Sequence, residues 1–154
     1  MRWHRWLATA RDPHGRGRVT IYHGWESGMD NSPRWDSSYA NVVPGQDLPP
    51  YVRADLDHVG GDVSMRPSDL EYDRYIWLVE QMKRANYDDE ILSDVMDFAV
   101  EDVFVSAILA VACDVLADIG EDHAKPLSDV RELRGWANRF RSGVVSATNE
   151  RNGA

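Results

Sequence analysis

The chain has 154 residues, of which 43% are hydrophobic and 28% charged, so it is about one domain long and has enough apolar residues for a core. Its formal net charge of −9 leaves no visible basic face, which excludes the usual nucleic-acid-binding and anionic-membrane-binding classes. Its one cysteine, Cys113, excludes an intramolecular disulfide and a multi-cysteine metal site.

The N-terminal stretch MRWHRWLATARDPHGRGR is basic but lacks the apolar core of a signal peptide. No uninterrupted run of about 18 apolar residues is present, so no membrane span is expected. We therefore expect a cytoplasmic protein. Cys113 lies in an apolar stretch and is expected to be a buried, inert thiol.

The first part of the chain alternates short elements and turns. Apolar residues at helical spacing predict a helix over residues 3–10, and the DPHG sequence after it predicts a turn. Residues 19–22 favour an extended conformation. Ser32 followed by Pro33 is typical of a helix start and predicts a short helix to about Asn41.

The second part is predominantly helical. Residues 43–67 predict a long irregular loop, and Ser68-Asp69-Leu70-Glu71 is a capping box that opens a helix to about Asn86. A short helix is expected over residues 88–94. The apolar stretch 100–119 predicts a buried helix ended by Gly120. Pro126 opens a last helix whose apolar stripe is Val130, Leu133, Trp136, Ala137, Phe140 and Val144. The fold class is therefore all-α.

Glu101 is a carboxylate at the start of the predicted buried helix. A rotation of about 100° per residue places it on the same face as Ile108, Val115 and Ile119. It is either a solvated end residue stabilised by the helix dipole or a group that faces a polar pocket.

The densest cluster of functional residue types is HGWESGMDNSPRWD, residues 23–36. Glu26, Asp30 and Asp36 lie there beside Trp25 and Trp35, with no lysine nearby. Glycosidic bond cleavage needs an acid to protonate the leaving oxygen and a second carboxylate. Tryptophans on either side of Asp30 would supply the desolvation that such an acid needs, and tryptophans also stack on sugar rings.

Two other interpretations of this cluster remain open. Asp30 and Asn31 could form a simple turn, with Trp25 and Trp35 as core anchors. His23 and Glu26 have the spacing of a metal pair, but no further ligands cluster with them, so no metal site and no cofactor are expected. Gly28 would allow a sharp backbone bend.

HGWESGMDNSPRWD resembles the signature of bacterial mannosylglycerate and glucosylglycerate hydrolases, which are relatives of glycoside hydrolase family 63. It departs from the family form at Gly24, where proline is usual. Weaker similarity continues through RDPHGRGRV, PYVRADLDHV, RPSDLEYDRYIWLVE, VEDVFVSAILA and LRGWANRF. The resemblance implies a six-fold α/α barrel, the six-hairpin glycosidase fold, of which about five or six helices and one long loop are present here. Residues 1–154 would then be an internal fragment of a single catalytic domain.

The resemblance also implies the site. Asp30 matches the general acid, and Trp35 matches a tryptophan that lines the sugar subsite, while Trp25, Glu26 and Asn31 would shape the substrate pocket. Relatives commonly have glutamine at the Glu101 position, where a substrate contact is expected. The family's general base is a glutamate far downstream that this chain does not contain.

The expected function is therefore that of part of an inverting glycoside hydrolase for small α-glucosides or α-mannosides such as glycosylglycerates, inactive on its own. Association through exposed barrel faces is a further expectation. The main alternative is a non-catalytic carbohydrate-binding or structural remnant of that fold. An unrelated helical interaction protein is a third hypothesis.

Overall fold

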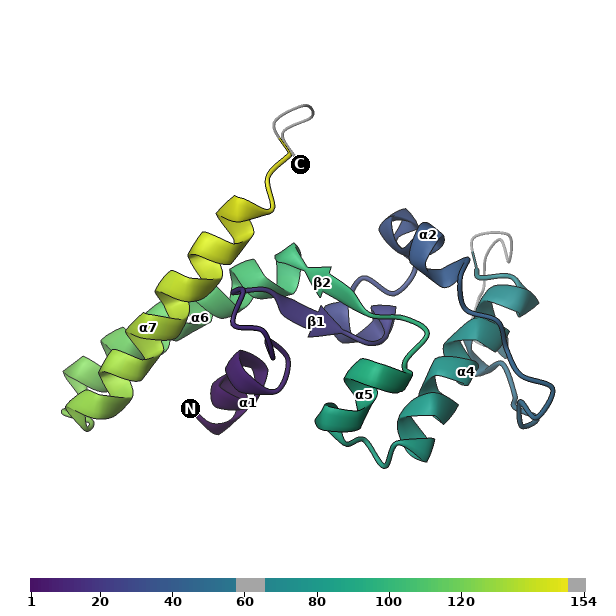
Figure 1. Cartoon of the computed structure of the whole chain (residues 1–154), viewed down its shortest axis with the longest axis horizontal. Helices are drawn as coiled ribbons and strands as arrows, with labels where there is room; N and C mark the ends of the chain where they lie inside the picture. Colours follow the sequence, from purple (N-terminus) through teal and green to yellow (C-terminus); the bar gives the residue numbers. More distant parts are fainter. Residues whose placement is uncertain (58–65, 150–154) are drawn as a thin grey trace. The chain divides into compact units, whose positions relative to one another are not determined.

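The computed structural model describes residues 1–57 and 66–149. The chain divides into two compact units: unit 1 comprises Met1–Ile21 and Val100–Ala154, and unit 2 comprises Tyr22–Ala99. The elements, shown in Figure 1, are α1 (Arg2–Thr9), β1 (Val19–Ile21), η1 (Gly24–Ser27), η2 (Pro33–Trp35), α2 (Asp36–Tyr39), α3 (Ala54–Asp57), α4 (Asp69–Arg84), α5 (Asp89–Val95), β2 (Val100–Asp102), α6 (Val103–Asp122) and α7 (Leu127–Ser146). Helices dominate, as the sequence predicts.

Unit 1 is built on the long helices α6 and α7, which pack side by side (Figure 1). The predicted stripe of the last helix is confirmed, because α7 buries Val130, Leu133, Trp136, Ala137 and Phe140. On α6 the facing residues Leu109, Cys113 and Ala117 are buried. Burial also raises the pKa of the Cys113 thiol to about 11, as expected for an inert cysteine.

The segment between α1 and β1 lies against α7 through two glycines. Gly17 has a φ of 71°, and a side chain on either Gly17 or Gly143 would overlap the backbone of the other segment. The buried carboxylate of Asp12 accepts hydrogen bonds from the backbone N–H groups of Arg16 and Gly17 and pairs with Arg139 of α7. This close contact explains why unit 1 contains both ends of the described chain.

Strands β1 and β2 form a two-stranded antiparallel sheet in unit 1, with Thr20 opposite Glu101. The extended conformation expected at residues 19–22 is confirmed, but the predicted helix start at residue 100 is wrong. Helix α6 begins only at Val103, where Asp102 caps it by accepting a hydrogen bond from the N–H of Phe104 at 2.9 Å. Pairing with β1 holds residues 100–102 extended, so Glu101 is a strand residue.

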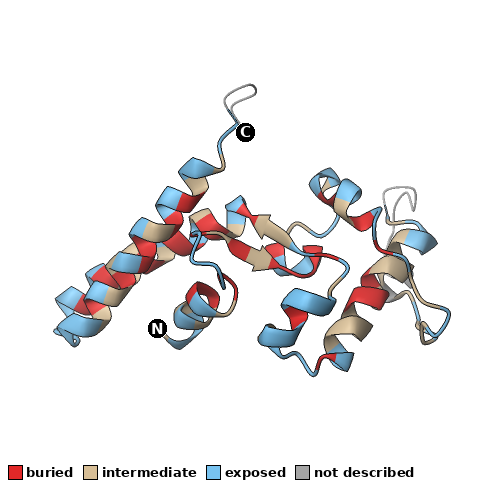
Figure 2. Cartoon of the chain, in the orientation of Figure 1, coloured by how far each residue is buried: buried red, intermediate tan, exposed pale blue. Residues whose placement is uncertain are grey.

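The expectation that the 100–119 helix is buried on all sides is also wrong. Figure 2 shows buried and exposed positions alternating along the helices. One face of α6 packs on α7, whereas Ile108, Val111, Val115 and Ile119 are 48–63% exposed. By length and composition alone, α6 is also apolar enough to cross a membrane. Core helices of soluble proteins meet the same criterion, and a third of the relevant stretch is buried.

Unit 2 is organised around α4. The predicted capping box is confirmed: Ser68 Oγ accepts from the N–H of Glu71, whose carboxylate accepts from the N–H of Ser68 at 2.7 Å. The short helix expected over residues 88–94 is confirmed as α5, and Asp88 is its N-cap. The core contains Tyr22, Val42, Leu78, Leu92 and Phe98. Part of the predicted long loop, residues 58–65, lies outside the described residues.

Candidate active site

Hydrogen bonds of His23 fix the start of the cluster at residues 23–36. His23 precedes η1 and accepts a hydrogen bond from the N–H of Trp25 at its Nδ1 atom, at 3.0 Å. Its Nε2 atom lies 3.1 Å from the carbonyl oxygen of Tyr75 on α4, to which the neutral ring donates. Burial lowers the pKa of His23, which keeps this ring neutral.

A sharp bend then directs the chain toward Asp30. Gly28 adopts the left-handed conformation with a φ of 71°, as its sequence position led us to expect. Ser27 Oγ donates to the carbonyl of Gly24 at 2.6 Å and accepts from the N–H of Met29 at 3.0 Å. These bonds use groups that are close together in the sequence, so the bend is encoded locally.

Asp30 lies at a polar cavity of about 490 Å³ within unit 2. Its lining residues come from the segment around η2, from α2 and from the start of α4, and they are Asp30, Asn31, Ser32, Asp36, Tyr39, Arg66, Pro67, Glu71, Arg74 and Tyr75. The cavity therefore combines three carboxylates, two guanidinium groups and two phenols. In composition it offers the many hydrogen-bonding groups that a small polyhydroxylated ligand requires.

The cavity walls differ from the sequence expectation. Trp35 is 3% exposed, donates its Nε1–H to the carbonyl of Met29 at 2.9 Å and packs edge-on against Phe98. Trp25 is 40% exposed and packs against His23 and Tyr75. Neither indole is among the described residues that line the cavity. The two tryptophans thus anchor the segment in unit 2, and their predicted contacts with a sugar remain untested.

Tyrosines replace the tryptophans as the aromatic walls. Tyr39 and Tyr75 lie with their ring centroids 4.8 Å apart. Burial raises the pKa of Tyr75 to about 12 and also raises the pKa of Tyr39, so both hydroxyls stay protonated near neutral pH. The Tyr39 hydroxyl accepts a hydrogen bond from the N–H of Gly24 at 3.0 Å.

The other predicted site residues are divided between the units. Asn31 joins Asp30 in the cavity lining, and both are exposed. Glu26 lies outside it and accepts a hydrogen bond from the N–H of Tyr22 at 2.6 Å. Glu101 belongs to unit 1, where it forms ion pairs with Arg16 and Arg18. Asp30 and Glu101 therefore lie in different units.

Sequence reasoning missed several cavity residues. Glu71, Arg74 and Tyr75 share one face of α4 because they are three and four positions apart, so helical spacing was an available signal. Arg66 precedes the helix, and nothing in its local sequence indicates the cavity. In the described part of the chain, no group of three or more His, Cys, Asp or Glu side chains could hold a metal ion.

Comparison with known proteins identifies the family. The family model for the mannosylglycerate hydrolase MGH1-like glycoside hydrolase domain matches residues 1–154. The chain is 66% identical, over its full length, to the glucosylglycerate hydrolase of Mycolicibacterium hassiacum, and it covers 34% of that protein. The chain therefore spans about a third of the length of this curated relative.

Two solved structures show the same fold. Family 63 mannosylglycerate hydrolase from Thermus thermophilus, in complex with Tris and D-glycerate, matches 97% of this chain with a TM-score of 0.86 and 37% identity, and the match covers 35% of that enzyme. Its complex with glucose matches 96% of this chain and 34% of the enzyme, with a TM-score of 0.83 and 38% identity. The predicted class, an all-α part of an α/α barrel, is confirmed by this likeness. The chain belongs to the mannosylglycerate hydrolase MGH1-like family of glycoside hydrolases.

Proposed function

We propose that Asp30 is the general acid of an inverting glycoside hydrolase that acts on small α-glucosides or α-mannosides, such as glycosylglycerates. The observation that carries this proposal is the polar cavity of unit 2, which Asp30 lines together with residues of α4. The family relationship and the names of the relatives supply the substrate class.

The roles of the cavity residues follow from their chemistry. A carboxylic acid at Asp30 would protonate the glycosidic oxygen as the bond breaks. The hydroxyls of Tyr39 and Tyr75, which burial keeps protonated by raising their pKa, are suited to bind sugar hydroxyls. Arg66 and Arg74 bring positive charge to the same cavity, which suits the carboxylate of a glycerate leaving group.

The second catalytic carboxylate would come from polypeptide outside these 154 residues. Glu71 lies at the cavity, but the N–H and hydroxyl of Ser68 bind its carboxylate and lower its pKa, so it is committed to capping α4. Asp36 lies at the start of α2, and no observation on this chain supports a catalytic role for it. We therefore expect no sugar release by this chain alone.

The exposure of Asp30 favours a second candidate function. A general acid needs a desolvated carboxyl, and unit 2 leaves Asp30 exposed, with both indoles outside the described cavity lining. A non-catalytic protein that binds carbohydrate in this cavity would have the same features. This alternative would be supported if calorimetry detected binding of glucosylglycerate to the chain without hydrolysis. The chimera described in the next paragraph would also have to bind the compound without hydrolysing it.

The test replaces the matching third of the M. hassiacum glucosylglycerate hydrolase with residues 1–154 of this chain. We expect the chimera to release sugar from glucosylglycerate or mannosylglycerate, with inversion at the anomeric carbon observed by NMR. Asp30→Asn should reduce kcat by about 10²–10⁴-fold, the usual contribution of a general acid. Asp94→Asn, which changes an exposed carboxylate on α5, is the matched control and should leave kcat unchanged. Full activity of Asp30→Asn would refute the proposal.

A further inference from the structure

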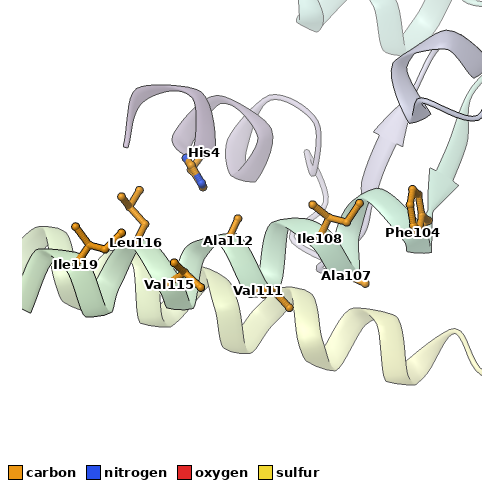
Figure 3. A pocket seen from close by; sticks show the side chains of 9 residues that line it. All are labelled: His4, Phe104, Ala107, Ile108, Val111, Ala112, Val115, Leu116 and Ile119. Atoms are coloured by element: carbon orange, nitrogen blue, oxygen red, sulfur yellow. The ribbon is translucent and has the colours of Figure 1, made fainter.

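His23 is a buried titratable side chain of unit 2 to which the proposed reaction assigns no role. It is 2% exposed, whereas His4 of unit 1 lies at an apolar groove along α6, as Figure 3 shows. A buried imidazole without hydrogen-bond partners would lose the free energy of its hydration in water. The partners of the two ring nitrogens therefore indicate what His23 does.

Both ring nitrogens of His23 have a main-chain partner, and the two partners lie far apart in the sequence. Nδ1 accepts from the N–H of Trp25, at the start of η1, at 3.0 Å. Nε2 lies 3.1 Å from the carbonyl oxygen of Tyr75 on α4. Because an N–H only donates and a carbonyl only accepts, the ring is the neutral tautomer with its proton on Nε2. One side chain thus joins the main chain of η1 to that of α4.

Two aromatic rings that pack around this imidazole also line the Asp30 cavity. The ring centroids of Tyr39 and Tyr75 lie 6.2 Å and 5.8 Å from that of His23, and the centroid of Trp25 lies 4.3 Å away. His23 itself is outside the described cavity lining. It therefore lies behind the cavity wall, where it supports lining residues without contacting a ligand in the cavity.

A short hydrogen-bonded segment connects His23 to Asp30. Ser27 Oγ accepts from the N–H of Met29 at 3.0 Å, and the carbonyl of Met29 accepts from the N–H of Ser32 at 3.1 Å. Helix α4 supplies further residues of the same cavity lining. The bond from His23 to the main chain of α4 therefore fixes the place of Asp30 relative to those residues.

We propose that His23 is a positioning residue for Asp30, which it holds in place relative to α4 through the hydrogen bond to Tyr75. The proposal rests on the proposed function, because it takes Asp30 to be the acid. A displacement of about 1 Å can reduce a rate by about 10²-fold. Loss of this bond therefore slows protonation of the leaving oxygen without removing any group that touches the substrate.

Two substitutions separate the two hydrogen bonds of His23. His23→Asn keeps an oxygen near the position of Nδ1 and can still accept from Trp25, but it is too short to reach Tyr75. His23→Gln carries an amide nitrogen near the position of Nε2 and can still donate to the Tyr75 carbonyl. In the chimera described above, we expect His23→Asn to reduce kcat for glucosylglycerate by about 10–10²-fold, with KM changed less than about threefold. His23→Gln should retain more of the original kcat.

A residue that acts only through Asp30 has no effect where the acid is not used. With α-glucosyl fluoride, whose leaving group needs no proton, His23→Asn should reduce kcat less than about threefold. In the Asp30→Asn background, it should also change kcat for glucosylglycerate less than about threefold. A substitution that only lowers stability would reduce all of these rates alike.

Trp77→Phe is the matched control for lost stability. Trp77 lies on α4, is 9% exposed and donates its Nε1–H to Asp97 at 3.0 Å. The substitution therefore removes one hydrogen bond of unit 2 outside the described cavity lining. It should change kcat less than about twofold, since it does not alter the connection between η1 and α4.

Hydrogen exchange on the chain alone tests the same proposal without turnover. The Nε1–H of Trp35 donates to the Met29 carbonyl at 2.9 Å, so its exchange reports on the peptide next to Asp30. His23→Asn should speed this exchange at least about tenfold, and Trp77→Phe less than about threefold.

Four outcomes would each overturn the positioning role. They are an equal loss of kcat with glucosylglycerate and the fluoride, a full further loss in the Asp30→Asn background, a kcat for His23→Asn at least as high as that for His23→Gln, and unchanged exchange at Trp35. Full activity of Asp30→Asn in the otherwise unchanged chimera would instead refute the proposed function, so the two failures are distinguishable. The exchange result decides the positioning role if the chimera releases no sugar.

Discussion

The environment of Gly24, the position where the family resemblance led us to expect proline, gives a quantitative prediction. Its φ is not in the left-handed region, so the backbone conformation itself would accept an alanine. A Cβ at Gly24, however, would lie only 2.4 Å from the hydroxyl oxygen of Tyr39. That hydroxyl also accepts the hydrogen bond from the N–H of Gly24. The absence of a side chain at Gly24 thus leaves room for the Tyr39 hydroxyl, and that hydroxyl satisfies the N–H of Gly24.

The magnitudes follow from these two contacts. Gly24→Ala forces Tyr39 to shift within an aromatic cluster that includes Tyr75 and Phe98, which should cost about 1–3 kcal/mol of unfolding free energy. Tyr39→Phe leaves the buried N–H of Gly24 without its acceptor, which should also cost about 1–3 kcal/mol. In the double variant the hydroxyl oxygen at 2.4 Å is gone, and the tight contacts that remain are with Trp35 Cδ1 at 3.1 Å and the ring carbon Cζ of residue 39 at 3.3 Å, so alanine should add a smaller cost than in the otherwise unchanged chain.

The assay is a double-mutant cycle measured by urea unfolding. We expect the two substitutions to be non-additive, with the double variant more stable than the sum predicts by about 1–2 kcal/mol. Strict additivity would show that the alanine does not meet the tyrosine hydroxyl, and it would refute the reasoning. A cost below the measurement error for Gly24→Ala in the otherwise unchanged chain would refute it as well.

Three further predictions concern other parts of the chain. Gly143→Ala should destabilise unit 1 strongly, because the new methyl group overlaps the backbone of Gly17. Gly135→Ala on the same helix is the control: its methyl group meets nothing within 4 Å, so the substitution should raise the unfolding free energy by up to about 1 kcal/mol. Thermal unfolding of the two variants measures the difference. Burial lowers the pKa of His23 in the folded state, so the unfolded chain binds more protons at this residue. The unfolding free energy should therefore fall as the pH decreases below about 6.5, the pKa of histidine in the unfolded chain. His23→Gln should remove this part of the pH dependence, as measured by urea titrations at several pH values. Cys113, with its raised pKa, should react with a disulfide reagent at about pH 8 only after urea unfolding, and rapid reaction of the folded chain would contradict its burial.

Local and periodic signals predicted the helical part of the fold well. The capping box of Ser68 and Glu71 acts over four residues, and the stripe on α7 repeats with the period of a helix, so both are readable without tertiary information. The sharp backbone bend at Gly28 was also predicted, and its hydrogen bonds join groups that are close together in the sequence.

Features that depend on distant residues were not predictable in this way. Glu101 belongs to a strand only because it pairs with Thr20, far earlier in the chain, and helical periodicity alone favoured a helix there. Trp35 was expected at the cavity because it neighbours Asp30 in sequence, but its ring turns toward Met29 and Phe98 instead. Side-chain direction in such short turns is set by the core that they pack against.

The direct test of the central claim, that Asp30 donates a proton to the leaving oxygen, varies the leaving group. In the chimera described above, the glycerate oxygen of glucosylglycerate must be protonated as it departs, whereas the fluoride of α-glucosyl fluoride leaves without a proton. We predict that Asp30→Asn reduces kcat by about 10²–10⁴-fold with glucosylglycerate but less than about tenfold with the fluoride. An equal loss with both substrates would mean that Asp30 serves binding or folding, and would contradict its assignment as the acid.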